Sequence, residues 1–297
     1  MTPRERGFLL LCSHLGEPDR PVLTAAQLRT LAIRARSMEV PEEDRKLSEG
    51  DFLALGYSRE MSRRIVAMLE DEQRLDDYLT RGRRMDCVPV TRASEGYPLL
   101  LRQKLGLDSP GCLWARGDLS ILNTPAIALV GSRDLREENR RFAERLGYEA
   151  AVQGVTLVSG NARGADRTAQ DACLEAGGRV ISIVADELNR HNPRQNQLLL
   201  SEEDFSQPFS TQRALSRNRC IHALGWMVFV AQARLYRGGT WDGTAKNLQF
   251  GWSPVACFRD GSESTEALSQ MGAFLVGMED LQDLAGLTRG MDRIYEL

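Results

Sequence analysis

Five short apolar runs dominate the second half of the sequence, and helix-like segments separate most of them. The runs are residues 126–130, 155–159, 179–184, 226–230 and 254–258. Short strands without polar alternation are typical of a parallel sheet that helices cover on both faces. The intervening helical stretches supply the long crossover connections that parallel strands need. We therefore expect an α/β fold with a Rossmann-like, doubly wound parallel sheet.

The N-terminal part of the sequence is organised differently, as a series of amphipathic helices. Thr24 and Ser58 are the expected N-caps of two of them, and the second helix is expected over residues 59–82. The spacing is typical of a helix–turn–helix or helix-hairpin-helix unit, which can hold nucleic acid or serve as a packing module. The pattern predicts three parts: a helical domain over 1–84, a linker over 85–110 and a Rossmann-like domain over 111–297.

Several functional classes find no support in the composition. No apolar run approaches the ~20 residues of a membrane helix, and the N-terminus lacks a signal-peptide pattern, so we expect a cytoplasmic protein. The six cysteines form no CxxC pair and only three histidines are present, which predicts no metal site and reduced, buried thiols. His191 and His222 stand alone and are expected to be structural. Neither GxxxxGK[ST] nor GxGxxG is present, so we expect no nucleotide cofactor.

Four segments near the expected strands are rich in glycine, arginine and hydroxyl residues. They are Gly131-Ser132-Arg133, residues 159–166 (SGNARGAD), residues 216–219 (SRNR) and residues 237–244 (RGGTWDGT). Ligands of open α/β sheets bind beyond the carboxyl ends of the strands. Glycines let backbone amides approach an anion, helix N-termini favour negative charge, and arginines bind phosphate. The four segments together predict a phosphate-bearing ligand, although any single glycine turn also suits a tight strand-to-helix connection.

Two details qualify these segments. Residues 216–219 are expected as a loop just before the helix that leads into the fourth strand. Asp166 is placed either in the ligand loop or as the cap of its own helix.

The net charge of −3 by itself argues against a nucleic-acid partner. Its distribution changes that interpretation, because residues 261–297 carry seven acidic and only two basic residues. Of the 38 basic residues, all but Lys46, Lys104 and Lys246 are arginine, the better bidentate partner for phosphate. An anion site can therefore coexist with an acidic chain.

Taken together, these segments resemble the DNA-processing protein A (DprA/Smf) family. The resemblance rests on AIALVGSRD, LVSGNARGADRTAQDACLEAGGRVISIV, RNRCIHAL and GGTWDGTAKNLQFGWSPVACF. It implies a sterile-alpha-motif-like helical domain and a Rossmann domain that forms homodimers, binds single-stranded DNA and passes it to a RecA-type recombinase. Matched motif by motif, it implies DNA contacts from Gly131, Ser132, Arg133, Ser159, Gly160, Asn161, Ala162, Arg163, Gly164, Asp166, Arg217, Asn218, Arg219, Gly239 and Thr240.

The sequence also departs from the family pattern. We expect no C-terminal winged helix, and GGTWDGT replaces the usual serine-containing segment after the fourth strand. These departures leave a second hypothesis open, in which the protein is a sensor of a nucleotide ligand or DNA. It would act as an antitoxin for a partner toxin or in an anti-phage defence module. A third reading is a nucleotide phosphoribohydrolase of the lysine-decarboxylase-like (LOG) branch. We disfavour it because Asn247 stands where that branch has its catalytic glutamate, and asparagine is no general base. A binding protein without enzymatic activity is the leading expectation.

Overall fold

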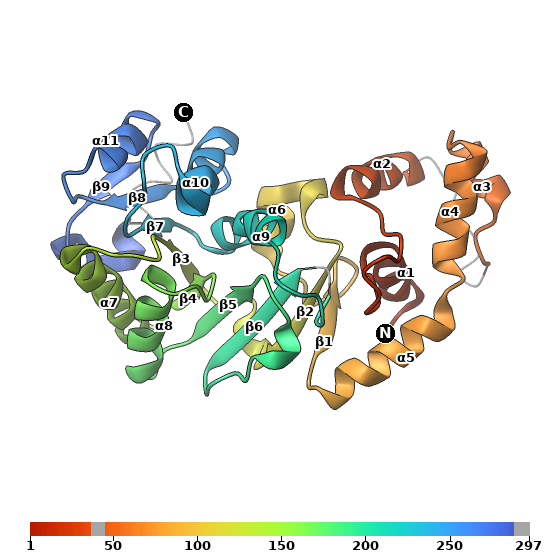
Figure 1. The fold of residues 1–297 in the computed structure, drawn as a ribbon, viewed down its shortest axis with the longest axis horizontal. Coiled ribbons are helices and arrows are strands. Elements are labelled where there is room, and N and C mark those ends of the chain that lie inside the picture. The colour runs from red at the N-terminus through yellow and green to blue at the C-terminus, as the bar shows by residue number, and fades with distance from the viewer. Residues whose placement is uncertain (37–44, 203, 288–297) are drawn as a thin grey trace.

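The computed structural model describes residues 1–36, 45–202 and 204–287, and Figure 1 gives its element labels. The strands within these residues are β1 (Val88–Thr91), β2 (Cys112–Gly117), β3 (Ala126–Val130), β4 (Thr156–Ser159), β5 (Val180–Val184), β6 (Gln197–Glu202), β7 (Val228–Val230), β8 (Val255–Phe258) and β9 (Phe274–Val276). The α-helices are α1 (Pro3–Cys12), α2 (Ala25–Ala35), α3 (Glu49–Ala54), α4 (Arg59–Leu69), α5 (Glu72–Arg84), α6 (Leu99–Leu105), α7 (Glu137–Val152), α8 (Ala165–Glu175), α9 (Thr211–Leu224), α10 (Gly238–Phe250) and α11 (Glu263–Gln270).

All of these strands belong to one sheet, in the order β1-β2-β6-β5-β4-β3-β7-β8-β9. The strands from β6 to β9 in this order are parallel, whereas β2 pairs antiparallel with β6 and with β1. The chain winds outward from β3 to β6 and then restarts at β7, on the other side of β3. The direction of winding therefore reverses between neighbours β3 and β7, as in doubly wound sheets. The predicted fold class is confirmed, and all five expected strands are present.

The sheet also contains strands that the apolar runs did not predict. In β6 only three apolar residues stand together, which is too short a run to indicate a strand by itself. This segment becomes a buried strand because β5 and β2 pair with its two edges. Residues 85–110, predicted as a linker, contribute β1 to the sheet and α6 to one of its faces.

Helices cover both faces of the sheet, and alternating residues of each strand serve the two layers. In β3, Ala126 and Ala128 face the core formed with α6, α9 and α10, whereas Ile127 and Leu129 face the core formed with α7 and α8. Figure 1 shows α9 and α10 on one side of the sheet and α7 and α8 on the other. This burial on both faces explains why the strand sequences are unbroken apolar runs.

The N-terminal helices form a unit with its own small core, which includes Phe52, Ile65 and Met68. Thr24 and Ser58 accept hydrogen bonds from backbone amides of the helices that they precede, which confirms both predicted N-caps. The single helix expected over residues 59–82 is wrong, because the chain breaks between α4 and α5. The break lets α5 turn towards the sheet while α4 stays in the helical core.

An aromatic cluster joins this helical unit to the sheet. Tyr78 of α5 stacks on Phe205 with ring centroids 4.3 Å apart, and Trp114 of β2 lies against both rings at 5.3 and 4.8 Å. All three side chains are buried. The helices α1 and α5 thus cover the β2–β6 end of the sheet, on the same face as α7 and α8.

The cysteines are free thiols, and five of the six are buried. Burial raises the pKa of Cys12, Cys173 and Cys257 to about 12 in each case, so these thiols stay protonated and unreactive at neutral pH. In the described parts of the chain, no helix combines the length and the apolar character needed to cross a bilayer.

Candidate functional site

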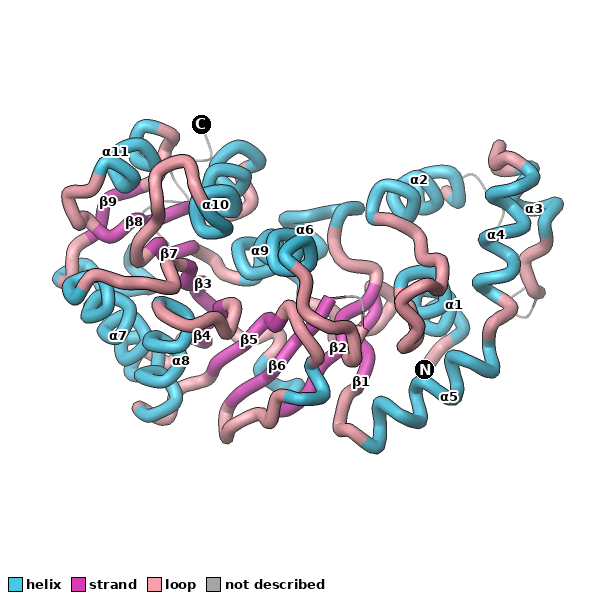
Figure 2. The backbone as a smooth tube through the Cα atoms, viewed as in Figure 1, coloured by secondary structure: helices cyan, strands magenta, loops and turns pink. Residues whose placement is uncertain are grey.

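Three loops meet at the carboxyl ends of β3, β4 and β7. This is the switch point of the sheet, where the direction of winding reverses, and we call the three loops the switch-point loops. The Ser132 amide donates to the Gln232 carbonyl (2.9 Å), and the Ala165 amide donates to the Ser132 carbonyl (3.1 Å). Figure 2 shows these loops gathered between the ends of α7, α8 and α10. Because α7, α8 and α10 all begin here, the positive ends of their helix dipoles lie at the same edge of the sheet, although the Ala165 amide of α8 is already paired.

Asp166 shapes the loop that follows β4. Its carboxylate accepts hydrogen bonds from the amides of Gly160 and Ala162, both at 3.1 Å, although it lies in the first turn of α8. Gly164 occupies the N-cap position, so the alternative of Asp166 as the cap of its own helix is wrong. Burial raises the pKa of Asp166, while the Arg217 guanidinium and the two amides oppose that shift. Asp166 therefore acts as an internal brace of the loop.

Arg217 is buried beneath the same loop. Its side chain is on α9, packs against Gly160 and donates to the Ile183 carbonyl at the end of β5. Burial lowers the pKa of Arg217, and the Asp166 carboxylate acts in the opposite direction. A Cβ at Gly160 would collide with the guanidinium, so any larger residue here would force the Arg217 side chain to shift. The prediction of a loop over residues 216–219 is wrong, since these residues form the middle of α9.

The two residues that follow Arg217 have different surroundings. Asn218 donates to the Gly239 carbonyl (3.1 Å) and so ties α9 to the first turn of α10, where Thr240 also lies. Arg219 instead forms an ion pair with Glu202 of β6. Residues two apart on a helix point in different directions, so Arg217 and Arg219 cannot line the same loop. The structure thus directs Arg219 away from the switch-point loops.

The hydroxyl groups of the predicted site are largely used within the protein. Ser132 Oγ accepts a hydrogen bond from the Asp134 amide (3.2 Å), and Ser159 Oγ accepts one from Gln170. Asn161 holds a left-handed backbone (φ 60°), and its Oδ1 is buried without a partner among the described residues. Gly131 lies where a Cβ would strike Ala165.

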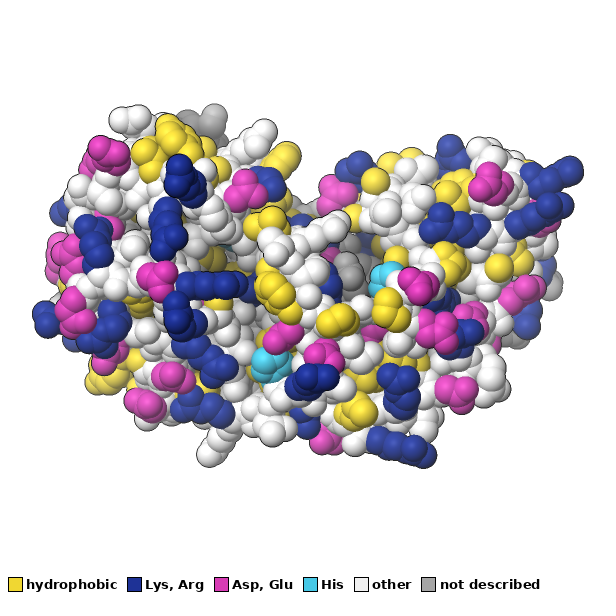
Figure 3. Space-filling view, in the orientation of Figure 1, with side chains coloured by type: hydrophobic (Ala, Val, Ile, Leu, Met, Phe, Trp, Pro, Cys, Tyr) yellow, Lys and Arg dark blue, Asp and Glu magenta, His cyan; other side chains and the backbone are white. Residues whose placement is uncertain are grey.

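Exposed arginines surround these loops. Arg163 and Arg234 both pair with Asp134, at 2.7 and 3.1 Å, and the two arginine side chains are 79% and 64% exposed. Arg133 and Arg237 are also exposed. Figure 3 shows a column of Lys and Arg side chains on the part of the molecule that carries β3, β4 and β7. Exposed ion pairs contribute only about 0–1 kcal/mol, so an incoming anion can displace Asp134 at little cost.

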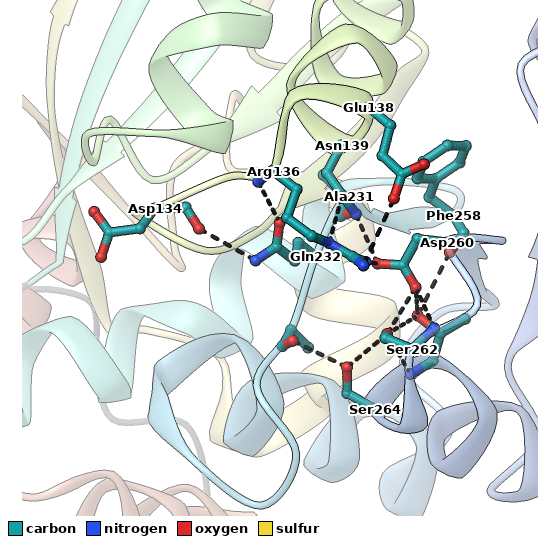
Figure 4. Close-up of polar contacts among 12 residues, drawn as sticks. Asp134, Arg136, Glu138, Asn139, Ala231, Gln232, Phe258, Asp260, Ser262 and Ser264 are labelled. Carbon is teal, nitrogen blue, oxygen red and sulfur yellow. Dashed lines mark hydrogen bonds and ion pairs between the residues drawn. The ribbon is translucent and has the colours of Figure 1, made fainter.

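A polar network behind the loops fixes their positions. The Asp260 side chain is fully buried and accepts hydrogen bonds from Asn139 (2.7 Å), Ser262 and Thr265, and it pairs with Arg136. Asn139 also donates to the Ala231 carbonyl (2.7 Å), while Gln232 donates to the Asp134 carbonyl (3.2 Å). Figure 4 shows the Asp134 carboxylate pointing away from this network.

This network, and the pairing of Asp134 with two arginines, were not among the sequence-based predictions. Asp260 follows β8 and Gln232 follows β7, so their positions after strands were a usable signal. The pairing of Asp134 with two arginines had no such signal, because it joins residues 29 and 100 positions apart.

The remaining candidates for chemistry are engaged elsewhere or isolated. Asn247 exchanges hydrogen bonds with the Ser253 backbone (3.0 and 2.9 Å) and clamps the turn before β8. His222 is fully buried between α9 and α10, and burial lowers its pKa to about 3. His191 lies 2.8 Å from Asp186. Three or more metal-ligating side chains are not found together anywhere in the part of the chain described.

The topology and the switch-point loops define a Rossmann-like α/β protein with exposed arginines at one edge of its sheet. A family model described as DNA recombination-mediator protein A matches residues 89–286, which is more than half of the chain. The chain therefore belongs to the DNA recombination-mediator protein A family.

Two relatives in sequence agree with this membership. Protein Smf of Escherichia coli is 32% identical over 62% of this chain and 52% of its own length. The DNA processing protein DprA of Streptococcus pneumoniae is 28% identical over 64% of this chain and 67% of its own length. The chain thus aligns with only about half to two thirds of these relatives.

Two solved structures share the fold. The DNA processing protein A of Streptococcus pneumoniae has a TM-score of 0.73 at 24% identity, covering 96% of this chain and 98% of that chain. The DNA processing protein A of Helicobacter pylori, described for its single-stranded DNA binding mode, has a TM-score of 0.55 at 23% identity, covering 70% and 96%.

Proposed function

We propose that this chain binds single-stranded DNA across the loops that follow β3, β4 and β7. The observation that carries the proposal is the set of exposed arginines around three helix N-termini at the switch point. Helix N-termini and arginines are the two protein groups best suited to phosphate. Membership of the recombination-mediator family, and a family structure described for single-stranded DNA binding, support this choice of ligand.

The same site favours binding without catalysis. Asp166 is committed to two amides beneath the loop, and Asn247 is committed to the Ser253 backbone. His222 is neutral and buried at any physiological pH. We therefore expect no base release from nucleoside monophosphates, the reaction that the phosphoribohydrolase reading requires. Base release at a rate above that of buffer alone would support the phosphoribohydrolase hypothesis.

The family also supplies expectations about partners. We propose that the chain acts as a homodimer that delivers single-stranded DNA to a RecA-type recombinase. The reading as an antitoxin or defence sensor stays a prediction. Light scattering of the purified chain, alone and with a RecA-type recombinase, tests both the dimer and the partner.

The binding proposal predicts the effect of reversing two exposed charges. The double variant Arg133→Glu/Arg163→Glu is expected to lose about a hundredfold in affinity for a labelled oligonucleotide at low salt. Both side chains are exposed, so the fold should be unaffected. The slope of log affinity against log salt should fall by about 0.7 for each phosphate of a single strand that the variant no longer neutralises.

A control with the same change in charge lies at the opposite edge of the sheet. Arg179 precedes β5 and Arg194 precedes β6, so both lie at the amino ends of the strands. Arg179→Glu/Arg194→Glu should bind as the wild type does. Equal losses in the two double variants would show that net charge, and not the loop site, determines affinity.

A further inference from the structure

An exposed aromatic side chain lies in one of the switch-point loops, the loop that follows β7. Tyr236 follows β7 and is 74% exposed, the largest fraction among the large apolar side chains of the described residues. Single exposed apolar residues are common on protein surfaces, so exposure alone assigns Tyr236 no role. Its neighbours in the loop are Arg234 and Arg237.

The loop holds Tyr236 in a defined place. The Arg237 amide donates to the Arg234 carbonyl (3.1 Å), which closes a tight turn with Leu235 and Tyr236 at its tip. The Tyr236 ring lies 5.0 Å from the ring of Trp241 at an interplanar angle of 71°. Trp241 is 8% exposed and anchored in the core between the sheet and α10. The Trp241 ring therefore supports one side of the Tyr236 ring, and most of the Tyr236 side chain is open to solvent.

The backbone at Tyr236 is also strained. Its φ of 56° lies in the left-handed region, which residues other than glycine, asparagine and aspartate rarely adopt. Such strain persists only where surrounding contacts impose it, and it concentrates at binding sites. Here the strain directs a bulky aromatic ring outward, beside cationic side chains.

We propose that Tyr236 stacks on an unpaired nucleobase of a strand whose phosphates contact the neighbouring arginines. This inference rests on the proposed function and deepens it, because it requires the ligand to present a free base face beside its phosphates. Single-stranded binding sites combine a basic groove with aromatic platforms in this way. In a duplex, stacking on both sides occupies the faces of the bases, so Tyr236 selects single strands.

The test compares oligo(dT) with an abasic deoxyribose-phosphate oligomer of the same length. Tyr236→Ala should lower the affinity for oligo(dT) about tenfold and leave the affinity for the abasic oligomer unchanged. Tyr236→Phe should bind both as the wild type does, because it keeps the ring. Tyr236→Gly should reproduce the alanine result. Since glycine suits a positive φ, that variant removes the ring without risk to the turn.

Phe250 provides the matched control at the other end of α10. It is 62% exposed and stacks on Trp252 with ring centroids 5.6 Å apart. Phe250→Ala should bind both oligomers normally. Unchanged oligo(dT) affinity in Tyr236→Ala, or equal losses on both oligomers, would overturn the stacking role. A wild-type chain that binds neither oligomer would instead refute the proposed function itself, so the two failures are distinct.

Discussion

Replacing Arg217 by methionine is expected to lower the free energy of unfolding by about 3 kcal/mol and to abolish oligonucleotide binding. Methionine keeps an unbranched, flexible side chain but is shorter than arginine and removes the charge that faces buried Asp166. It also removes the hydrogen bond to the Ile183 carbonyl and the support beneath Gly160. The loop after β4 then loses its fixed shape. Urea unfolding and fluorescence anisotropy measure the two effects.

The destabilisation in this variant should depend on pH. Burial already raises the folded-state pKa of Asp166, and removing the Arg217 charge raises it further. A raised carboxyl pKa penalises the folded state above that pKa and leaves it unaffected below the unfolded value. The difference in stability between wild type and Arg217→Met is therefore largest at pH 7. It should shrink as the pH falls towards 4, and a constant difference from pH 7 to pH 4 would contradict this role of Asp166.

Arg219→Met is the control on the same helix. It breaks the partly buried ion pair with Glu202 and should also destabilise the fold. The molecules that remain folded should still bind the oligonucleotide, because Arg219 points towards β6. Failure of this folded variant to bind would show that Arg219 contacts DNA, as the family resemblance implies.

Gly164→Ala is expected to have an effect of similar size on the same loop. Gly164 has a φ of 87°, and a Cβ there would meet the carbonyl oxygens of Ser132 and Arg133. With ψ at −128°, Gly164 adopts a backbone conformation that is readily open only to glycine, and the clash adds to the cost of leaving it. The loops after β3 and β4 must separate to relieve the clash. We expect more than about 3 kcal/mol of destabilisation in urea unfolding and no measurable binding by anisotropy.

Gly177 is the control for a positive φ without a clash. It has a φ of 79°, but nothing lies within 4 Å of the position that a Cβ would take. Gly177→Ala should therefore cost only about 1 kcal/mol and should bind normally. Equal destabilisation by the two alanines would mean that backbone strain, and not the clash between loops, decides the effect at Gly164.

The sequence indicated most of the fold because the responsible signals are local. Apolar runs predicted the five strands around the switch point, and Thr24 and Ser58 marked two helix starts. The rule that ligands bind at the carboxyl ends of parallel strands then brought Arg133, Gly160 and Gly239 to one edge. The structure places the segments that carry these three residues at one edge, but residues 216–219, predicted as a fourth loop there, lie within α9.

What the sequence alone could not determine is which charged side chains remain available to a ligand. Arg163, Arg217 and Arg219 all belong to the segments that predicted the anion site, yet one is exposed, one is buried under a loop and one is paired with Glu202. Asp134 and Tyr236 gave no signal of their own. The apolar patterns of strands and helices involve residues close together in the sequence, so the sequence alone predicts these elements. Burial and pairing of a charge depend on residues far apart in sequence, and only the folded arrangement decides them.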